Sequence, residues 1–288
     1  MSSLVHWHGE QPKLRRPLLL AALEGFVDAG AAAGTAAAFL RHRWKADVIA
    51  SFDRDELIDF RARRPTAVVE HGTLSRVEWP EVELFAATID GPHDALLLLG
   101  PEPDMRWSAF CHAVVEVCRQ ASVEQMIGLG AYPAPVPHTR PTRIRRASNL
   151  ATTVEGPLAE LPGVPSYTGP TGIARMIQAA LAEVGIPAVG LLAEIPHYLA
   201  GAPNPAGALA LARAAGTLFQ VEVDSVELET AAKLHREQVD ETLAEHEEAV
   251  EMVRALERQY DLGEADAALT TGEDIAAEIE RFLRSQSD

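Results

Sequence analysis

Three carboxylates lie at the ends of apolar runs, and these are the side chains best suited to chemistry. Asp28 and Glu102 each follow such a run within a few residues, and Glu194 ends another, together with His197. Carboxylates beside a histidine can do acid–base work when burial adjusts their pKa values. In open α/β sheets, ligands bind beyond the carboxyl ends of the strands. We therefore expect the three carboxylates to share one rim of a sheet.

The segment 166–198 is the clearest structural unit, because a Gly/Pro loop leads into a helical pattern and then into an apolar strand. Thr171 precedes Gly172 and is predicted to cap the helix, whose free N–H groups suit an anion. Gly185 is predicted to end the helix in the left-handed conformation. A turn that binds no ligand is the competing interpretation of Gly169 and Gly172.

An arginine-rich stretch at 138–146 offers a second kind of site. It could bind a carboxylate or a phosphate, or it could pair with the acidic residues of the C-terminal tail, which is the favoured interpretation. No residue is assigned as catalytic, and no metal or cofactor site is predicted. The candidate ligand-binding residues are Asp28, Glu102, Trp107, Arg140, Tyr167, Gly169, Thr171, Gly172, Glu194 and His197.

Two of the carboxylates also have a purely structural interpretation. Asp28 precedes an Ala-rich segment that ends at Arg43, and its side chain is well placed to cap that helix. Glu102 could simply accept hydrogen bonds from the N–H groups of its loop. The acid–base hypothesis therefore depends on whether these side chains converge in one pocket.

Apolar patterning predicts a mixed, largely parallel sheet. Continuous apolar runs are typical of central strands covered on both faces, and they occur at 18–23, 95–99, 123–129 and 188–195. Shorter strands are predicted at 48–52, at 66–69 and 83–89 as antiparallel strands, and at the edge at 142–146.

Helical patterns separate and follow these runs. They are predicted up to Arg43, from Trp107, at 172–184, at 204–215 and at 225–260. Steps of four and three predict a coiled-coil-like seam in the last of these, formed by Val239, Leu243, His246, Val250 and Val253. Thr271 and Asp274 resemble a capping box for one more helix.

The charge is unevenly placed along the 288 residues. The formal net charge is −17, and the part from Glu222 onward has twenty acidic against six basic residues. The rest of the chain is nearly neutral. We therefore expect an α/β core domain at 1–221 and an acidic helical extension at 222–288.

Composition also argues against several classes of protein. A nucleic-acid binder would need a large basic face, and no apolar run reaches the roughly 20 residues of a membrane span. The N-terminus is not typical of a secretory signal, and the two cysteines, Cys111 and Cys118, are expected to be core thiols in a reducing cytoplasm. The phosphate-binding, dinucleotide-binding, serine-hydrolase and zinc-protease motifs are all missing.

Four motifs spread along the chain resemble the proteasome assembly chaperone 2 family. They are GFVDAG from Gly25, LLGPEPDMRW ending at Trp107, Y-x-G-P-x-G from Tyr167 to Gly172, and EIPHY from Glu194. The FRARRP run and the acidic helical tail are similar to the actinobacterial branch of that family.

The resemblance implies a three-layer α/β/α fold like that of purine nucleoside phosphorylases, and self-association, with a trimer as one option. For eukaryotic and archaeal relatives it implies chaperoning of proteasome α-subunits. Our first hypothesis is a cytoplasmic, non-enzymatic binding or assembly protein that acts as a homo-oligomer, with a further protein partner for the acidic helices. The alternative is a ligase- or hydrolase-like enzyme that binds a small molecule at the strand ends.

Overall fold

Four parallel strands form the centre of the structure, a computed structural model that describes residues 4–149 and 161–262. In spatial order they are β7 (Ala95–Pro101), β2 (Leu18–Glu24), β8 (Gln125–Ala134) and β10 (Ala188–Pro196). Both faces of these strands are covered, which explains why they appear in the sequence as continuous apolar runs. All four were predicted.

Antiparallel strands extend the sheet on both sides to eight strands. β6 (Glu83–Ala87), β3 (Asp47–Phe52) and β1 (Val5–Trp7) follow β7 in that order, and β9 (Ile144–Ser148) pairs with β10 at the other edge. Because β6 is antiparallel to both β7 and β3, β3 runs in the same direction as the four central strands. Five carboxyl ends therefore point to one rim of the sheet.

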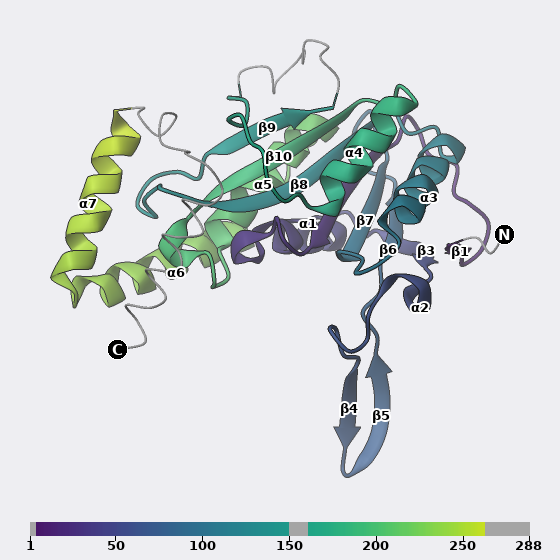
Figure 1. Cartoon of the computed structure of the whole chain (residues 1–288), viewed down its shortest axis with the longest axis horizontal. Helices are drawn as coiled ribbons and strands as arrows, with labels where there is room; N and C mark the ends of the chain where they lie inside the picture. The colour runs from purple at the N-terminus through teal and green to yellow at the C-terminus, as the bar shows by residue number, and fades with distance from the viewer. Residues whose placement is uncertain (1–3, 150–160, 263–288) are drawn as a thin grey trace.

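Helices cover both faces of the sheet, and the predicted three-layer α/β/α arrangement is confirmed (Figure 1). One face packs against α1 (Ala32–Arg43) and α5 (Pro205–Phe219), and the other against α3 (Trp107–Gln120) and α4 (Ile173–Glu183). The buried alanines of α1, such as Ala32 and Ala36, allow the helix to lie close to the sheet.

Both cysteines lie on α3 and are buried and free, as predicted. Burial raises the pKa of the Cys111 thiol to about 11 and that of the Cys118 thiol to about 12. These thiols are therefore core side chains with little thiolate at neutral pH. None of the described helices combines the length and the apolar character needed to span a bilayer.

A hairpin of two strands projects from the body of the molecule (Figure 1). β4 (Thr66–Glu70) pairs only with β5 (Thr73–Glu78), a strand that the sequence analysis did not predict. His71 and Gly72 connect them, and both have positive φ values, 51° and 77°, as a tight type I′ turn requires. The strands predicted at 66–69 and 83–89 both exist but belong to different sheets.

The C-terminal helical region consists of two helices instead of one continuous seam. α6 (Val226–Ala244) and α7 (Glu247–Asp261) are separated at His246, which has extended backbone angles and is the N-cap residue of α7. The predicted coiled-coil seam is therefore wrong. Leu243, Val250 and Val253 instead line a groove beside His138 of the core. The predicted capping box at Thr271 and Asp274 lies outside the described residues.

Candidate functional site

The strand-end rim brings the predicted carboxylates to one edge of the sheet. Asp28 lies beyond β2 and forms an isolated parallel bridge with Ala131 of β8, while Glu102 directly follows β7. Glu194 lies near the end of β10, opposite Tyr132 of β8. Since β7 and β10 are three strand spacings apart, about 14 Å, Glu102 and Glu194 share the rim but belong to separate clusters.

Glu102 connects three loops of the rim through its buried carboxylate. Its Oε2 accepts a hydrogen bond from the Phe26 N–H at 3.3 Å, and its Oε1 accepts one from the Ile173 N–H, the first residue of α4. A negative carboxylate at a helix N-terminus is favourable because the helix dipole is positive there. The predicted cap by Thr171 is wrong, since Gly172 is the N-cap residue and Glu102 supplies the acceptor.

Two glycines make room for this carboxylate. A Cβ on Gly25 would lie 2.4 Å from Glu102 Oε2, and a Cβ on Gly172 would lie 3.4 Å from Oε1. The substitution at Gly25 would therefore clash, while that at Gly172 would be tight. This explains the glycines at two positions of the GFVDAG and Y-x-G-P-x-G motifs.

Asp28 caps α1 although it does not directly precede the helix. A short 3-10 turn, η1 (Ala29–Ala31), separates it from the helix, and its Oδ1 and Oδ2 accept hydrogen bonds from the N–H groups of Ala33 and Gly34 at 2.7 and 3.2 Å. Burial raises the pKa of the Asp28 carboxyl, the two backbone hydrogen bonds oppose the shift, and nearby Glu24 adds to it. The predicted capping role is confirmed, although the geometry differs from an ordinary N-cap.

Glu194 forms a cluster with two other polar side chains, the buried Arg145 and the half-buried Tyr132. Its Oε1 accepts hydrogen bonds from the Tyr132 hydroxyl at 3.0 Å and from Arg145 Nε at 2.7 Å. Burial and the neighbouring carboxylate raise the pKa of Tyr132. Glu194 Oε2 is buried and has no hydrogen-bond partner among the described residues. The sequence analysis did not place Arg145 or Tyr132 in the site.

Arg140 and Arg143 of the arginine-rich stretch contact the C-terminal helix α7, as the favoured interpretation predicted, whereas Arg145 pairs with Glu194 in the core. Arg140 forms a bidentate pair with Asp261 at 2.9 and 2.8 Å and also donates to Glu257 of α7. Arg143 lies over the ring of Tyr260, 3.6 Å from its centroid, and donates to the Tyr260 carbonyl. These contacts place Arg140 at α7, and not beside Glu102.

The remaining predicted residues lie around the same rim. The Tyr167 hydroxyl donates to the Pro170 carbonyl, and a Cβ on Gly169 would lie 2.5 Å from that hydroxyl, so the tyrosine folds back over its own turn. Trp107 begins α3, and its indole N–H donates to the Pro103 carbonyl. His197, in the short turn η2 (His197–Leu199), packs edge-on against Tyr198.

Large apolar side chains are exposed on the loops that Glu102 connects. Phe26 is 65% exposed, Tyr167 is 58% exposed and Met105 is 44% exposed. Met105 belongs to the Glu102 loop, whose backbone also bonds the Leu57 carbonyl at the end of α2 (Arg54–Leu57). Sequence reasoning missed Phe26 and Met105, although both lie inside the quoted motifs. We call Phe26, Met105 and Tyr167 the rim patch.

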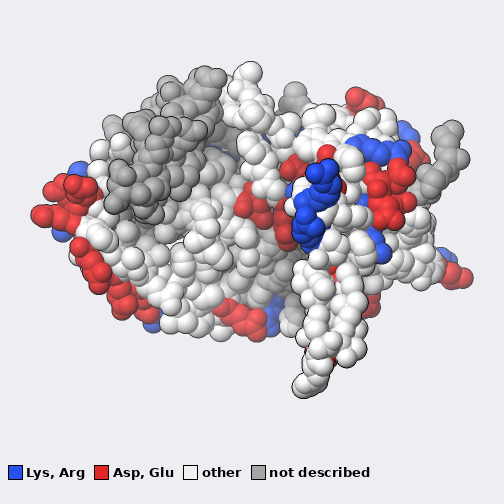
Figure 2. Space-filling view, turned by 60° about the horizontal axis from the view of Figure 1, so that its bottom comes forward, with Lys and Arg blue, Asp and Glu red and all other residues white. Residues whose placement is uncertain are grey.

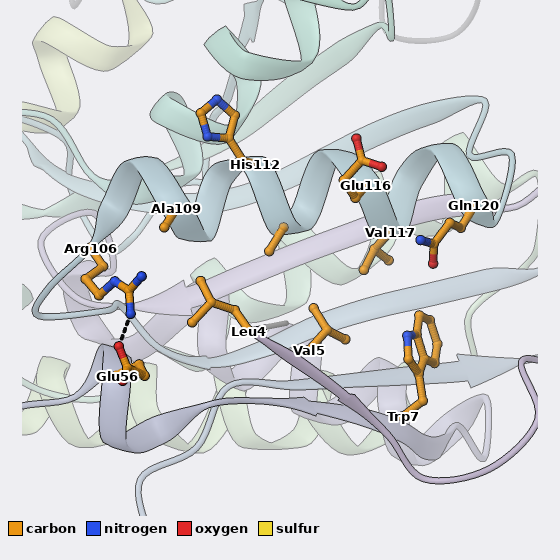
Figure 3. A pocket seen from close by; sticks show the side chains of 11 residues that line it. Leu4, Val5, Trp7, Glu56, Arg106, Ala109, His112, Glu116, Val117 and Gln120 are labelled. Carbon is orange, nitrogen blue, oxygen red and sulfur yellow. Dashed lines mark hydrogen bonds and ion pairs between the residues drawn. The ribbon is translucent and has the colours of Figure 1, made fainter. Parts of the chain in front are cut away.

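A groove runs along α3 beside the first strand of the sheet (Figure 3). Its volume is about 710 Å³, and none of the predicted site residues lines it. Its apolar lining comes from Leu4, Val5 and Trp7 on one side and from Ala109, Ala113 and Val117 on the other. An ion pair between Arg106 and Glu56 stands at the rim end, and Gln120 lies at the other end.

The chain shares its family profile and its fold with known proteins. The PAC2 family profile matches residues 22–243. A Corynebacterium glutamicum protein of unknown function has 31% identity and a TM-score of 0.83, with 90% of this chain and 98% of that chain covered. Among proteins with curated functions, none matches.

Two further solved structures have names that mention the proteasome. A Mycobacterium tuberculosis protein described as the proteasome-assembly chaperone homologue Rv2125 has 34% identity and a TM-score of 0.75, with 82% of this chain and 99% of that chain covered. Pyrococcus furiosus PbaB, described as an archaeal proteasome activator, has 17% identity and a TM-score of 0.65, with 83% and 97% covered. At that identity the second similarity shows the fold alone.

Proposed function

Because the chain belongs to the PAC2 family, we propose that it is a non-enzymatic, chaperone-like binding protein that acts as a homo-oligomer. The observation that carries this proposal is the rim patch. Its apolar side chains are exposed, while the carboxylates of the same rim, Asp28 and Glu102, accept hydrogen bonds from backbone N–H groups. Large exposed apolar side chains grouped on one side of a protein are typical of a protein-binding surface.

The name of a related protein of known structure supports the proposal that the bound partner is a protein. At 34% identity, the M. tuberculosis structure is named a proteasome-assembly chaperone homologue. We therefore infer that the rim patch binds a protein subunit, with proteasome subunits of the same organism as the first to test. We also propose a cytoplasmic location, which the two free, buried thiols support.

The acidic helices are proposed as a second contact surface. One side of α7 is held against the core by Arg140 and Arg143. The opposite side carries exposed acidic residues, including Glu248 and Glu251. A partner for this side would need a basic surface, because opposite charges steer association.

The test is a binding measurement between the purified full chain and purified proteasome α-subunits. We expect Phe26→Glu combined with Met105→Glu to weaken binding at least tenfold, because both changes place charge in the patch. Val226→Glu is the matched control, since Val226 is a similarly exposed apolar residue on α6. Equal affinity of the rim variant and the wild type would contradict the rim patch as the client surface.

An enzyme that binds a small molecule is the second candidate, and Glu194 favours it. Its buried Oε2 has no hydrogen-bond partner among the described residues, next to a tyrosine hydroxyl and an arginine. Such an oxygen suits a ligand that donates a hydrogen bond. A thermal-shift screen with nucleosides, nucleotides and carboxylates tests it. Stabilisation that Glu194→Gln abolishes would favour the enzyme, and no stabilisation would favour the binding protein.

A further inference from the structure

We propose that the protein segment bound at the rim patch is acidic, and that Arg61 and Arg64 bind its carboxylates beside Met105. This inference rests on the proposed function, because it takes the rim patch as the client surface. It adds the chemistry of the partner, which is a peptide segment with an apolar side chain and carboxylates close to it in the sequence.

A loop with three arginines follows α2 and adjoins the rim patch. We call residues 58–65 the α2 loop. The carbonyl of Leu57, the last residue of α2, accepts hydrogen bonds from the N–H groups of Asp104 and Met105 at 2.9 and 3.2 Å. Because Met105 belongs to the rim patch, the start of the α2 loop is bonded directly to that patch.

The Asp104 carboxylate holds the α2 loop in place. Its Oδ2 accepts a hydrogen bond from the Asp59 N–H at 2.9 Å, and its Oδ1 accepts one from Arg63 Nε at 3.2 Å. The Asp59 carbonyl accepts hydrogen bonds from the N–H groups of Ala62 and Arg63, both at 2.9 Å, which closes a tight turn. The loop is therefore ordered before a partner binds, which lowers the entropy cost of binding.

The ion pairs around the α2 loop leave two guanidinium groups free. Three neighbouring arginines are already paired with carboxylates, and the pairs are Arg54–Glu81, Arg63–Asp104 and Arg106–Glu56. Arg61 and Arg64 are exposed, and neither side chain has an ion pair or a hydrogen bond with another residue of 4–149 or 161–262. A free guanidinium can bind a carboxylate through two parallel hydrogen bonds.

Nearby acidic residues limit the negative charge that this site can accept. Asp55 is exposed on α2, and the Asp59 carboxylate accepts a hydrogen bond from the Arg61 N–H at 2.9 Å. Figure 2 shows basic side chains where the hairpin leaves the body of the molecule, with acidic side chains on both sides of them. These acidic side chains would repel a polyanion such as nucleic acid, whereas one or two carboxylates of a peptide can reach the free arginines.

The rim patch supplies the apolar half of the site. Met105 is 44% exposed and Phe26 is 65% exposed. Glu102, in the same loop as Met105, accepts a hydrogen bond from the Phe26 N–H, so the two apolar side chains come from loops that are joined to each other. A small anion would leave this apolar surface uncovered. A peptide segment with an apolar side chain beside its carboxylates would cover it.

The acidic helix α7 of a second copy is a poor alternative occupant. Its outer side provides carboxylates, such as Glu248 and Glu251. However, every exposed residue of α7 is charged apart from Gln259, so this helix offers no exposed apolar side chain for the rim patch. The site is therefore assigned to a different protein.

The first experiment measures the affinity of purified proteasome α-subunits for variants of the full chain. The test variant is Arg61→Glu with Arg64→Glu. The matched control is Lys13→Glu with Lys45→Glu, since both lysines are exposed and precede β2 and β3, at the opposite end of the sheet. We expect binding at least tenfold weaker for the test variant and within twofold of the wild type for the control. Equal midpoints of urea denaturation would show that both variants are folded.

Peptide probes test the chemistry of the partner directly. The first is a fluorescein-labelled peptide of two leucines, two glutamates and four serines, and the second has glutamines in place of the glutamates. By fluorescence anisotropy we expect the wild type to bind the first at least tenfold more tightly than the second. The preference should disappear in the test variant, and it should decrease in 0.5 M NaCl because salt screens exposed charges.

The outcomes separate this inference from the proposed function. If the rim variant, Phe26→Glu with Met105→Glu, weakens binding of the α-subunits and the arginine variant does not, only this inference is overturned. Equal affinity of the two peptides would also overturn it alone. If neither variant weakens binding, the rim patch fails as the client surface as well. Arginine-dependent binding of the glutamate peptide, without binding of α-subunits, would support the inference and exclude these subunits as the client.

Discussion

At the scale of single residues, Glu102 is expected to matter more for stability than for chemistry. Its carboxylate accepts two backbone N–H groups, from the Phe26 loop and from the start of α4. Glu102→Ala removes the acceptor of both donors, of which the Ile173 N–H is buried and the Phe26 N–H is partly buried, and a buried unsatisfied donor costs about 1–3 kcal/mol. We expect the free energy of unfolding, measured by urea denaturation, to fall by about 3 kcal/mol.

Two control variants distinguish the loss of the hydrogen bonds that Glu102 accepts from a general effect of removing a negative charge on stability. Glu102→Gln retains one acceptor oxygen and should lose less stability than Glu102→Ala. Glu183→Ala removes an exposed carboxylate near the other end of α4 and should change stability by less than about 0.5 kcal/mol. A loss from Glu183→Ala as large as that from Glu102→Ala would refute the role assigned to the buried carboxylate.

Asp28 should give stability a pH dependence of unusual sign. Its pKa is raised in the folded state, mainly by burial, so the folded protein binds the proton more tightly than the unfolded chain. The stabilising contribution of Asp28 relative to asparagine is therefore largest below its ordinary pKa, near 3.8. That contribution should decrease as the pH rises through the raised folded pKa, and then stay constant.

Urea denaturation of the wild type and of Asp28→Asn between pH 3 and pH 8 checks this sign. The stability difference between the two proteins should be smaller at pH 8 than at pH 3. The opposite trend would mean that the two backbone hydrogen bonds from Ala33 and Gly34 outweigh burial.

The position of the carboxylates on one rim of the sheet could be predicted from the sequence, but their hydrogen-bond partners could not. Apolar runs followed by polar residues placed Asp28, Glu102 and Glu194 on one edge, because parallel strands end together. The predicted Thr171 cap failed because the acceptor for Ile173 comes from 71 positions earlier in the chain. Local sequence can show that a helix needs a cap, but it does not show that a distant carboxylate supplies it.

At the scale of elements, the hairpin and the helix break show where local patterns were insufficient. The His71–Gly72 pair separates two alternating segments by two residues, which is a hairpin signal, but His is uncommon in such turns and β5 was missed. The residues of the predicted seam, which includes His246, follow the alternating steps of four and three residues that a coiled coil requires. A spacing rule assumes an unbroken helix, and here the helix ends at Ala244 so that α7 can reach the core.

The attachment of α7 to the core is expected to depend on Arg140. Its bidentate pair with Asp261 holds the pKa of that carboxyl below its usual value, and it also contacts Glu257. Arg140→Ala removes these charge-assisted hydrogen bonds. We expect amide hydrogen exchange in 247–261 to become severalfold faster, while exchange in the central strands stays unchanged.

Salt and a matched variant test the electrostatic cause. The pair is exposed, so 1 M NaCl should accelerate exchange in α7 of the wild type and have less effect in Arg140→Ala. Arg119→Ala removes an exposed arginine that pairs with Glu116 within α3, and it should leave α7 unchanged. Unchanged exchange in Arg140→Ala would mean that apolar contacts alone hold the helix.

At the scale of the whole molecule, the exposed surfaces divide into three kinds. The rim patch and the hairpin are apolar, the groove is apolar and concave, and the outer side of the C-terminal helices is acidic. The hairpin leaves the sheet on the same side as the rim patch, because β3 ends at the same rim as β7. The hairpin and the proposed client surface therefore lie at the same end of the sheet.

The proposed boundary near residue 222 predicts that the α/β core folds without the C-terminal helices. All eight strands of the sheet and the four helices that cover it end by Phe219. Leu228 of α6, and Val253 and Leu256 of α7, are the buried apolar side chains beyond that point among the described residues. Each contributes about 1.5–3 kcal/mol when fully buried.

Three chains ending at Leu262, Ala244 and Asp224 provide the measurement, since they differ only in described residues. We expect all three to unfold cooperatively in urea, with stability decreasing stepwise and the shortest chain losing roughly 4.5–9 kcal/mol in total. Loss of near-ultraviolet circular dichroism and of a cooperative transition in the chain ending at Asp224 would show that the two parts form one folding unit. Truncation from Leu262 to Ala244, which removes α7, should also expose the arginine-rich stretch, because Arg140 and Arg143 lose their partners on that helix.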